Sequence, residues 1–145
     1  MTDEWKKIFI SPQKFHDDII KLTNLIPKNK YKYVTGIPRG GLIPATYISH
    51  FCELEFISYR AEIFKFFEEK LSEILLVDDL TDTGLAITEI ISYINSPYIN
   101  PIDTAVVYYK PRSAVNPTYY VEEVKNSDWL VFPFEQSDET PNREV

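Results

Sequence analysis

A cluster of carboxylates directly follows an apolar run in the segment EILLVDDLTDTGLAI, residues 73–87. Asp78 and Asp79 are adjacent, Asp82 follows three positions after Asp79, and Thr83-Gly84 comes next. A single Asp often marks only the point where a buried strand reaches the surface. Adjacent carboxylates, however, repel each other unless a cation or a hydroxyl-rich ligand lies between them. The cluster therefore predicts a site for sugar hydroxyls, for hydrated Mg²⁺, or for both.

A second segment, TGIPRGG at residues 35–41, joins one cation to paired glycines. Gly40 and Gly41 let the backbone approach an anion closely, and Arg39 adds a positive charge. A Gly-Gly pair alone is as often only a turn. Further along the chain, Thr83-Gly84 begins a predicted helix, whose free N–H groups can hold a phosphate monoester. The two segments together indicate a phosphorylated ligand.

Alternating strand and helix patterns position these segments. We expect strands at residues 5–10, 31–37, 54–60, 73–79 and 102–110, and helices at 11–26, 41–54 and 84–94. The first helix has Ser11 as N-cap and Pro12 in its first position. The alternation predicts an α/β fold with a mostly parallel central sheet flanked by helices, in which ligands bind beyond the carboxyl ends of the strands.

Length, charge and cysteine usage narrow the classes of function. A chain of 145 residues fits one domain, and a net charge of −7 argues against a nucleic-acid or membrane-surface binder. Cys52 is the only cysteine and cannot form an internal disulfide. The N-terminal residues do not resemble a signal peptide, and no apolar run is long enough to span a membrane. We expect a cytoplasmic protein.

The segments TGIPRGG and ILLVDDLTDTG, in this order and separated by one strand, resemble the pyrophosphate loop and the ribose-phosphate signature of type I phosphoribosyltransferases. The later segment VVYYKPRSAVNPTYYVEEVKNSDWLVFPFE is similar to the C-terminal part of bacterial xanthine-guanine phosphoribosyltransferases. The resemblance implies a single phosphoribosyltransferase-like domain over residues 1–145. An N-terminal strand and helix would occupy about 1–30, the core 31–110, a small irregular or β-rich base-binding C-terminal hood 111–135, and a polar tail 136–145.

The implied reaction is attack of a 6-oxopurine nitrogen on the anomeric carbon of 5-phosphoribosyl-1-pyrophosphate, with pyrophosphate leaving and Mg²⁺ as cofactor. The resemblance assigns the phosphoribosyl pyrophosphate site to Arg39, Gly40, Gly41, Asp78, Asp79, Asp82, Thr83, Gly84, Leu85 and Ala86. Asp79 would hold Mg²⁺, through water and together with Asp78. Arg39 would stabilise the leaving pyrophosphate, and Asp82 would assist proton transfer at the purine.

The resemblance also implies the purine site. Lys110 would donate to the 6-oxo group, which selects against the 6-amino group of adenine because that group offers no acceptor. Trp129 would stack on the base, and the main-chain carbonyl of Leu130 would read its 2-position. Without the upstream motifs, a strand-end Lys is usually solvated and such a Trp usually packs in a core. Glu135 is a candidate for the edge of the site.

Three features depart from the family pattern. Leu85 and Ala86 follow Thr83-Gly84 where the family has a small residue and a Thr, so one hydroxyl donor to the 5′-phosphate is missing. Residues 60–73 are shorter and richer in Phe than the family's mobile catalytic loop. Pro38 precedes Arg39, which leaves open whether the Ile37-Pro38 bond is cis.

These departures keep a second hypothesis open, a non-catalytic sensor that binds phosphoribosyl pyrophosphate or a nucleotide. Retention of Asp82, Lys110 and Trp129 favours the enzyme, since a sensor does not need all three. His16 and His50 have no second ligand nearby in the sequence and are expected to be structural. Cys52 is expected to be a buried apolar residue. The resembling enzymes are commonly oligomers, so a homo-oligomer is expected.

Overall fold

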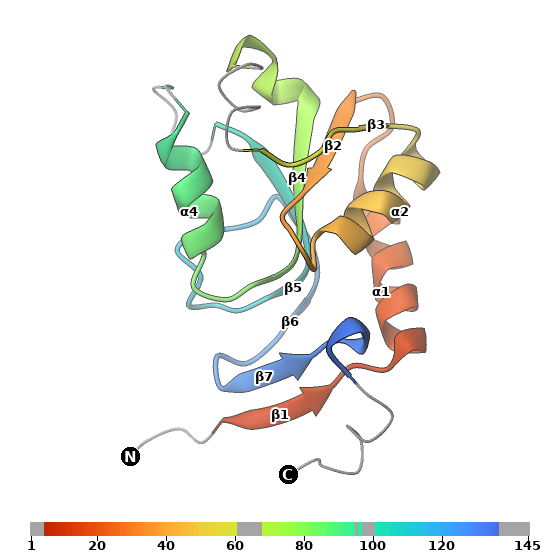
Figure 1. The fold of residues 1–145 in the computed structure, drawn as a ribbon, viewed down its shortest axis with the longest axis vertical. Helices are drawn as coiled ribbons and strands as arrows, with labels where there is room; N and C mark the ends of the chain where they lie inside the picture. Colours follow the sequence, from red (N-terminus) through yellow and green to blue (C-terminus); the bar gives the residue numbers. More distant parts are fainter. Residues whose placement is uncertain (1–4, 61–67, 95, 97–100, 137–145) are drawn as a thin grey trace.

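The computed structural model describes residues 5–60, 68–94, 96 and 101–136, and a five-stranded sheet lies at its centre (Figure 1). Its strands are β2 (Tyr33–Gly36), β3 (Glu55–Phe56), β4 (Ile74–Thr81), β5 (Asp103–Tyr109) and β6 (Tyr119–Glu123). They lie in the order β3-β2-β4-β5-β6, and every neighbouring pair is parallel. Parallel strands bring their carboxyl ends to the same edge of the sheet, so the loops after β2, β4 and β5 meet there.

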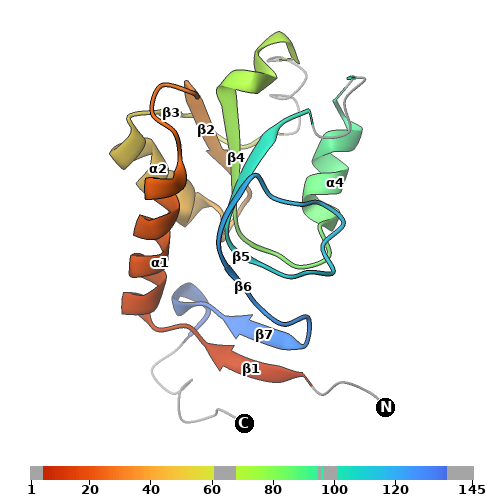
Figure 2. The same ribbon diagram turned by 180° about the vertical axis from the view of Figure 1, so that it is seen from behind.

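Helices cover both faces of the sheet. Helices α1 (Pro12–Leu25) and α2 (Leu42–Cys52) pack on one face, and α4 (Leu85–Ser92) packs on the other, as the two opposite views show (Figures 1 and 2). The central strand β4 is buried on both sides: Leu75 and Val77 pack with α1 and α2, whereas Ile74 and Leu76 pack with α4. This explains its continuous apolar run, which is typical of parallel strands covered on both faces.

Helix α1 is fixed at its first turn and along its length. The Ser11 side chain accepts a hydrogen bond from the backbone N–H of Lys14 at 3.0 Å, as its predicted role as N-cap requires. The buried Asp18 carboxylate accepts hydrogen bonds from Tyr108 Oη at 2.7 Å and Lys14 Nζ at 2.8 Å. These contacts tie α1 to β5, the strand that ends next to Lys110.

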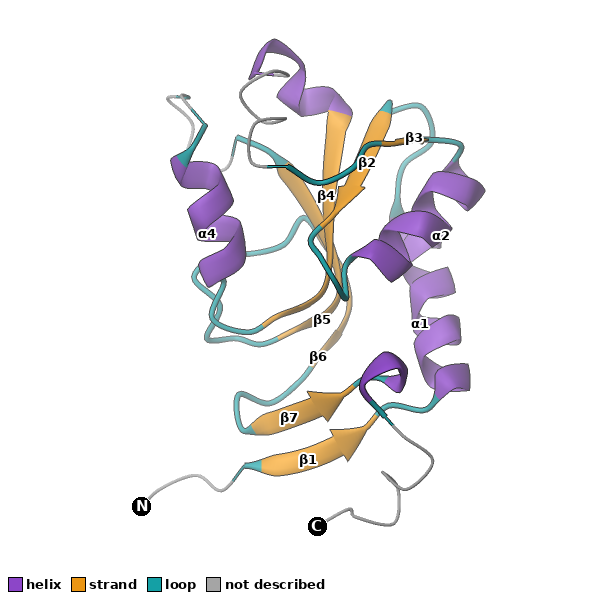
Figure 3. Cartoon of the chain, viewed as in Figure 1, coloured by secondary structure: helices purple, strands orange, loops and turns teal. Residues whose placement is uncertain are grey.

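A separate two-stranded parallel sheet lies beyond the carboxyl ends of β4 and β5 (Figure 3). It pairs β1 (Lys6–Phe9) with β7 (Asp128–Val131), and Lys6 lies opposite Asp128. A short 3₁₀ helix (Pro133–Glu135) follows β7, and Phe132 packs on Phe15 of α1 at 5.4 Å between ring centroids. We call β1, β7 and this 3₁₀ helix the cap.

The structure corrects the predicted hood. Residues 111–135 do not form one irregular unit, because β6 joins the main sheet beside β5. Tyr119 and Val121 alternate toward the core under α1, a two-residue period that went unnoticed within the aromatic-rich segment. The cap is also not only C-terminal, since β1 supplies half of it.

Other predicted boundaries shift less. Strand β4 runs to Thr81, two residues past the predicted end at Asp79, so the acidic pair lies inside the strand and not at its last two positions. The strand expected at 54–60 is confined to Glu55–Phe56, and a 3₁₀ segment (Glu68–Glu73) leads into β4. Most of the short Phe-rich segment 60–73, namely 61–67, and most of the polar tail, 137–145, lie outside the described residues. Within the described part of the chain, no helix is long and apolar enough to cross a membrane.

Candidate active site

The Arg39 loop, residues 37–41, is held directly against β4. Ile37 N donates to Val77 O at 2.9 Å, and Gly41 N donates to Ile37 O at 2.8 Å. Gly40 lies so close to β4 that a Cβ at this position would overlap the Asp79 carboxylate. A larger residue at position 40 would displace the Asp79 carboxylate, and this contact joins the two motifs that the sequence analysis singled out.

The Arg39 loop contains a cis peptide bond between Pro38 and Arg39. The sequence had left open a cis bond one position earlier, between Ile37 and Pro38, and that bond is not cis in the structure. The Arg39 side chain itself is exposed and lines a cavity together with Gly40 and Asp79.

The carboxylates of Asp78 and Asp79 are only partly exposed and electrostatically coupled. Burial raises the pKa of Asp78 well above its usual range, and the neighbouring Asp79 carboxylate raises it further. Burial also raises the pKa of Asp79. Two ionised carboxylates side by side repel each other. A bound cation, or hydroxyl groups that donate hydrogen bonds to them, would stabilise the ionised pair.

A small cavity of about 160 Å³ lies between β4 and the start of α4. It is lined by Asp78, Leu80, Thr81, Asp82, Thr83, Gly84, Leu85, Ala86 and Ile87. Gly84 has φ +82°, a conformation that glycine adopts without strain, and it turns the chain into α4. The backbone N–H groups at the start of α4 make this cavity a suitable site for a phosphate. As predicted, Ala86 provides no hydroxyl here.

A larger cavity of about 370 Å³ lies beside it, between the ends of the main strands and the cap. It brings together residues from both predicted sites and is lined by Trp5, Arg39, Gly40, Asp79, Leu80, Asp82, Lys110, Trp129, Leu130, Phe132, Phe134 and Glu135. Gly41 is the predicted site residue that lines neither cavity. It begins α2 and packs under the Arg39 loop.

Asp82 lies at the centre of an ion-pair network. Arg112 Nε donates to Asp82 Oδ1 at 2.6 Å, and Lys110 Nζ lies 3.5 Å from Asp82 Oδ2. Lys110 is almost completely buried, with 1% of its surface exposed, and it also donates to Asn126 O at 3.3 Å. A fixed ammonium in a cavity with a carboxylate and an aromatic ring can hydrogen-bond a flat heterocycle with an exocyclic oxygen.

Among the residues that were not predicted from the sequence, Arg112 holds Asp82 and Trp5 lines the cavity. Arg112 follows Lys110 by two positions in the same turn, so its proximity could have been read from the segment KPRS. Trp5 precedes β1, and its indole lies over Lys110 with 4.9 Å between Nζ and the ring centroid. No local pattern pointed to Trp5, because only the pairing of β1 with β7 brings it to the site.

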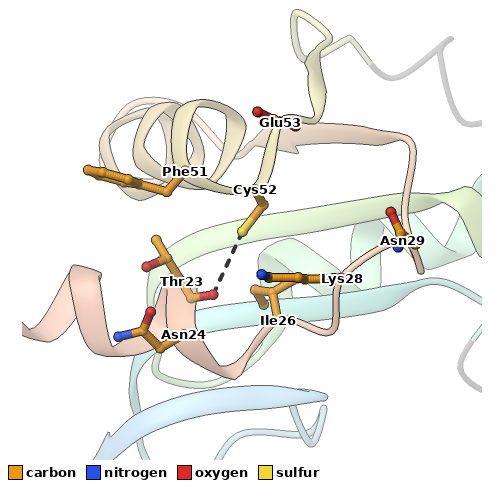
Figure 4. A pocket seen from close by; sticks show the side chains of 8 residues that line it. All are labelled: Thr23, Asn24, Ile26, Lys28, Asn29, Phe51, Cys52 and Glu53. Atoms are coloured by element: carbon orange, nitrogen blue, oxygen red, sulfur yellow. Dashed lines mark hydrogen bonds between the residues drawn. The ribbon is translucent and has the colours of Figure 1, made fainter.

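The remaining residues considered from the sequence lie elsewhere. His16 Nδ1 hydrogen-bonds Tyr47 Oη at 3.0 Å, and the His50 ring packs edge-on against Phe51. Cys52 is half-buried and not fully buried as expected. Burial raises the pKa of its thiol, which lies 3.7 Å from Thr23 O in a cavity at the ends of α1 and α2 (Figure 4).

The chain belongs to the phosphoribosyl transferase family, because the model of the phosphoribosyl transferase domain matches residues 13–139. It is 30% identical to the xanthine-guanine phosphoribosyltransferase of Desulfotalea psychrophila, over 93% of this chain and 91% of that protein. Among solved structures, a purine phosphoribosyltransferase from Pyrococcus horikoshii superposes with a TM-score of 0.71 at 25% identity, covering 90% of this chain and 95% of that one.

A further solved structure supports the same fold. The xanthine-guanine-hypoxanthine phosphoribosyltransferase of Helicobacter pylori superposes with a TM-score of 0.70 at 17% identity, covering 91% of this chain and 94% of that one. The predicted type I phosphoribosyltransferase fold is thus confirmed.

Proposed function

We propose that this protein is a purine phosphoribosyltransferase of purine salvage. It would transfer the 5-phosphoribosyl group from 5-phosphoribosyl-1-pyrophosphate to guanine, xanthine or hypoxanthine and release pyrophosphate. The observation that carries this proposal is the continuous arrangement of the two cavities. One is lined by Asp78 and the start of α4, and the other by Arg39, Asp79, Lys110 and Trp129.

The phosphoribosyl half of the substrate fits the smaller cavity and the Arg39 loop. The 5′-phosphate would accept hydrogen bonds from backbone N–H groups of residues 83–86, and the ribose hydroxyls would donate to Asp78 and Asp79. The leaving pyrophosphate would lie against Arg39, whose guanidinium can stabilise the charge that builds up as the glycosidic bond breaks.

The acidic pair also fits a divalent cation. In the described residues, no group of three or more His, Cys, Asp or Glu side chains could hold a metal ion. A cation at Asp79, with Asp78 acting through water, would therefore take its other oxygens from water and from the substrate, which is the usual coordination of Mg²⁺. When bound, Mg²⁺ would neutralise charge on the pyrophosphate.

The base would bind in the larger cavity. Lys110 would donate to the 6-oxo group, the Trp129 ring would stack on the purine, and the Leu130 carbonyl would accept from a 2-amino group. Asp82 would lie beside the imidazole ring and accept the proton that the attacking nitrogen loses. For this step Asp82 would exchange part of its contact with Arg112 for the base.

Incubation of the protein with phosphoribosyl pyrophosphate, Mg²⁺ and each purine base tests the proposal. The expected result is formation of the 5′-monophosphate of guanine, xanthine or hypoxanthine, and none with adenine. Omission of Mg²⁺ should abolish turnover. Tight binding of phosphoribosyl pyrophosphate without any product would instead support a non-catalytic sensor.

The cytoplasmic location and the homo-oligomeric state expected from the sequence are kept as proposals that rest on the resemblance. Light scattering coupled to size-exclusion chromatography tests the oligomeric state directly.

A further inference from the structure

The chain has two tryptophans, and both line the same cavity. Trp129 is the residue expected to stack on the base. Trp5 lies at the Lys110 end of this cavity, with its ring centroid 4.9 Å from Lys110 Nζ and 5.2 Å from Arg112 Cζ. Both indoles keep about half of their surface exposed, 54% for Trp5 and 52% for Trp129, so both have area left for a ligand.

The cap fixes the position of Trp5. The next residue, Lys6, donates its backbone N–H to Ser127 O at 3.0 Å and pairs with Asp128. One step further, Lys7 pairs with Trp129 and places its Nζ 4.8 Å from the Trp129 ring centroid. One strand pair therefore holds both the backbone that directly follows Trp5 and the backbone of Trp129.

The environment of Lys110 gives the Trp5 ring a chemical role. The ammonium has three N–H donors, and among the described residues it has Asn126 O at 3.3 Å as a hydrogen-bond acceptor and Asp82 Oδ2 at 3.5 Å as an ion-pair partner. A third donor is left for a ligand. An aromatic face over the ammonium excludes water and interacts favourably with the cation, so it preserves this donor for an exocyclic oxygen.

We propose that Trp5 is a purine-contacting residue that forms a second aromatic wall of the base site, at the end where the 6-oxo group meets Lys110. This inference rests on the proposed purine transfer. It assigns the N-terminal strand a direct part in base binding, in addition to the contribution of β7. A flat bicyclic base would then touch the indole ring of Trp5, just before β1, and that of Trp129 in β7.

Single-tryptophan variants test this contact directly. Trp129→Phe leaves Trp5 as the only tryptophan, and Trp5→Phe leaves Trp129. Guanosine monophosphate is titrated into each variant, with excitation at the red edge of indole absorption, where guanine absorbs little. Saturable quenching is expected in both variants, at the midpoint that calorimetry gives for the same titration. Ribose 5-phosphate, which lacks the base, should quench neither variant comparably.

Steady-state kinetics provide a second readout. Trp5→Ala should raise the KM for guanine by on the order of tenfold, as expected for loss of one aromatic wall, while the KM for phosphoribosyl pyrophosphate changes by less than about twofold. Trp5→Phe should keep most of the purine affinity because it retains a ring. Phe51→Ala is the matched control: Phe51 is 57% exposed but lies at the far end of α2 (Figure 4), so its loss should leave both KM values unchanged.

The outcomes separate this inference from the function on which it rests. If the Trp129→Phe variant binds guanosine monophosphate by calorimetry but its Trp5 emission does not change, Trp5 does not contact the base and the inference is wrong. An equal rise of both KM values in Trp5→Ala would likewise assign Trp5 to general stability of the cap. If the unmodified protein neither binds nor makes a purine nucleotide, the proposed function itself is wrong, and the inference about Trp5 loses its basis.

Discussion

The phosphoribosyl end and the purine end of the candidate site are built in different ways. The phosphoribosyl end consists of two short continuous segments, residues 37–41 after β2 and residues 78–86 from the end of β4 to the start of α4; β2 and β4 are adjacent, and backbone contacts fix both segments. The purine end consists of side chains from segments far apart in the sequence, with Trp5 before β1, Lys110 after β5 and Trp129 in β7. Main-chain geometry sets the first end, whereas tertiary packing sets the second.

This difference predicts that changes at the phosphoribosyl end act on every substrate pair, while changes at the purine end act on the choice of base. Five substitutions test the comparison, from the largest expected effect to the smallest.

The double substitution Asp78→Asn and Asp79→Asn should abolish binding of phosphoribosyl pyrophosphate in the presence of Mg²⁺, because it removes the charge that attracts the cation. The fold should stay intact or become slightly more stable, since the repulsion between two partly buried carboxylates is relieved. Titration calorimetry and thermal unfolding measure the two quantities. Unchanged binding would refute the role of the acidic pair, and Asp17→Asn on the exposed face of α1 serves as control.

Arg39→Ala should lower turnover by on the order of a hundredfold, similar to the loss of one fixed donor to a developing anion. Affinity for the purine should change much less. Steady-state kinetics with each substrate varied in turn measure both effects. Arg39→Lys, which keeps the charge but loses the planar fork, should fall in between. If Arg39→Ala lowers the affinity for the purine more than it lowers turnover, Arg39 belongs to the base site instead.

Lys110→Met should reduce discrimination between guanine and adenine by about 1–3 kcal/mol, because the unmodified ammonium would face adenine without an acceptor. Binding of phosphoribosyl pyrophosphate should be spared. Ratios of kcat/KM for the two bases measure the effect. Lys28→Met at the far cavity is the matched control. Equal activity of the unmodified protein with adenine and guanine would contradict the assignment of Lys110.

Trp129→Ala should weaken the binding of guanine, xanthine and hypoxanthine equally, by about 1–3 kcal/mol, because stacking does not depend on ring substituents. Competition binding of the three bases measures this. Trp129→Phe retains an aromatic ring and should therefore keep most of the binding affinity that Trp129→Ala loses. A loss confined to one base would show that Trp129 reads a substituent and does not only stack.

Ala86→Thr should tighten binding of phosphoribosyl pyrophosphate by about 0.5–1.5 kcal/mol, the net contribution of one hydrogen bond, if the residue restores the missing hydroxyl next to the 5′-phosphate. Ala86→Val has nearly the same shape without the hydroxyl and is the control. If both variants behave alike, the start of α4 does not hold the phosphate as proposed.

The phosphoribosyl end and most of the fold could be predicted from the sequence because their signals are local. Ser11 and Pro12, with the spacing of Phe15, Ile19 and Leu22, placed α1 correctly. The roles of the apolar run of β4 and of the glycines around Arg39 can each be inferred from a few neighbouring residues. Even so, the predicted strand ended at Asp79, two residues too early, since strand length depends on pairing with β5, which continues to Thr81.

The purine end could be predicted only in part, for a physical reason. Trp129 and Lys110 came from the family resemblance, not from any local pattern. Arg112 and Trp5 acquire their roles only when β5, the turn after it and the cap come together. The position of β6 was missed because a short alternation of Tyr119 and Val121 is hard to distinguish among many aromatic residues. Contacts between distant segments leave little trace in either segment alone.

The pairing of β1 with β7 also has a consequence for how the protein folds. Lys6 and Asp128 lie near opposite ends of the sequence, so this ladder depends on the most distant contact in the chain and forms most easily after the segments between them have folded. During synthesis the ribosome must release residues up to 131 before the pair can form, whereas β2, β4 and their helices can assemble earlier. The cap should therefore be the last unit to fold and the first to open. Hydrogen exchange should show its amides to be less protected than those of β4.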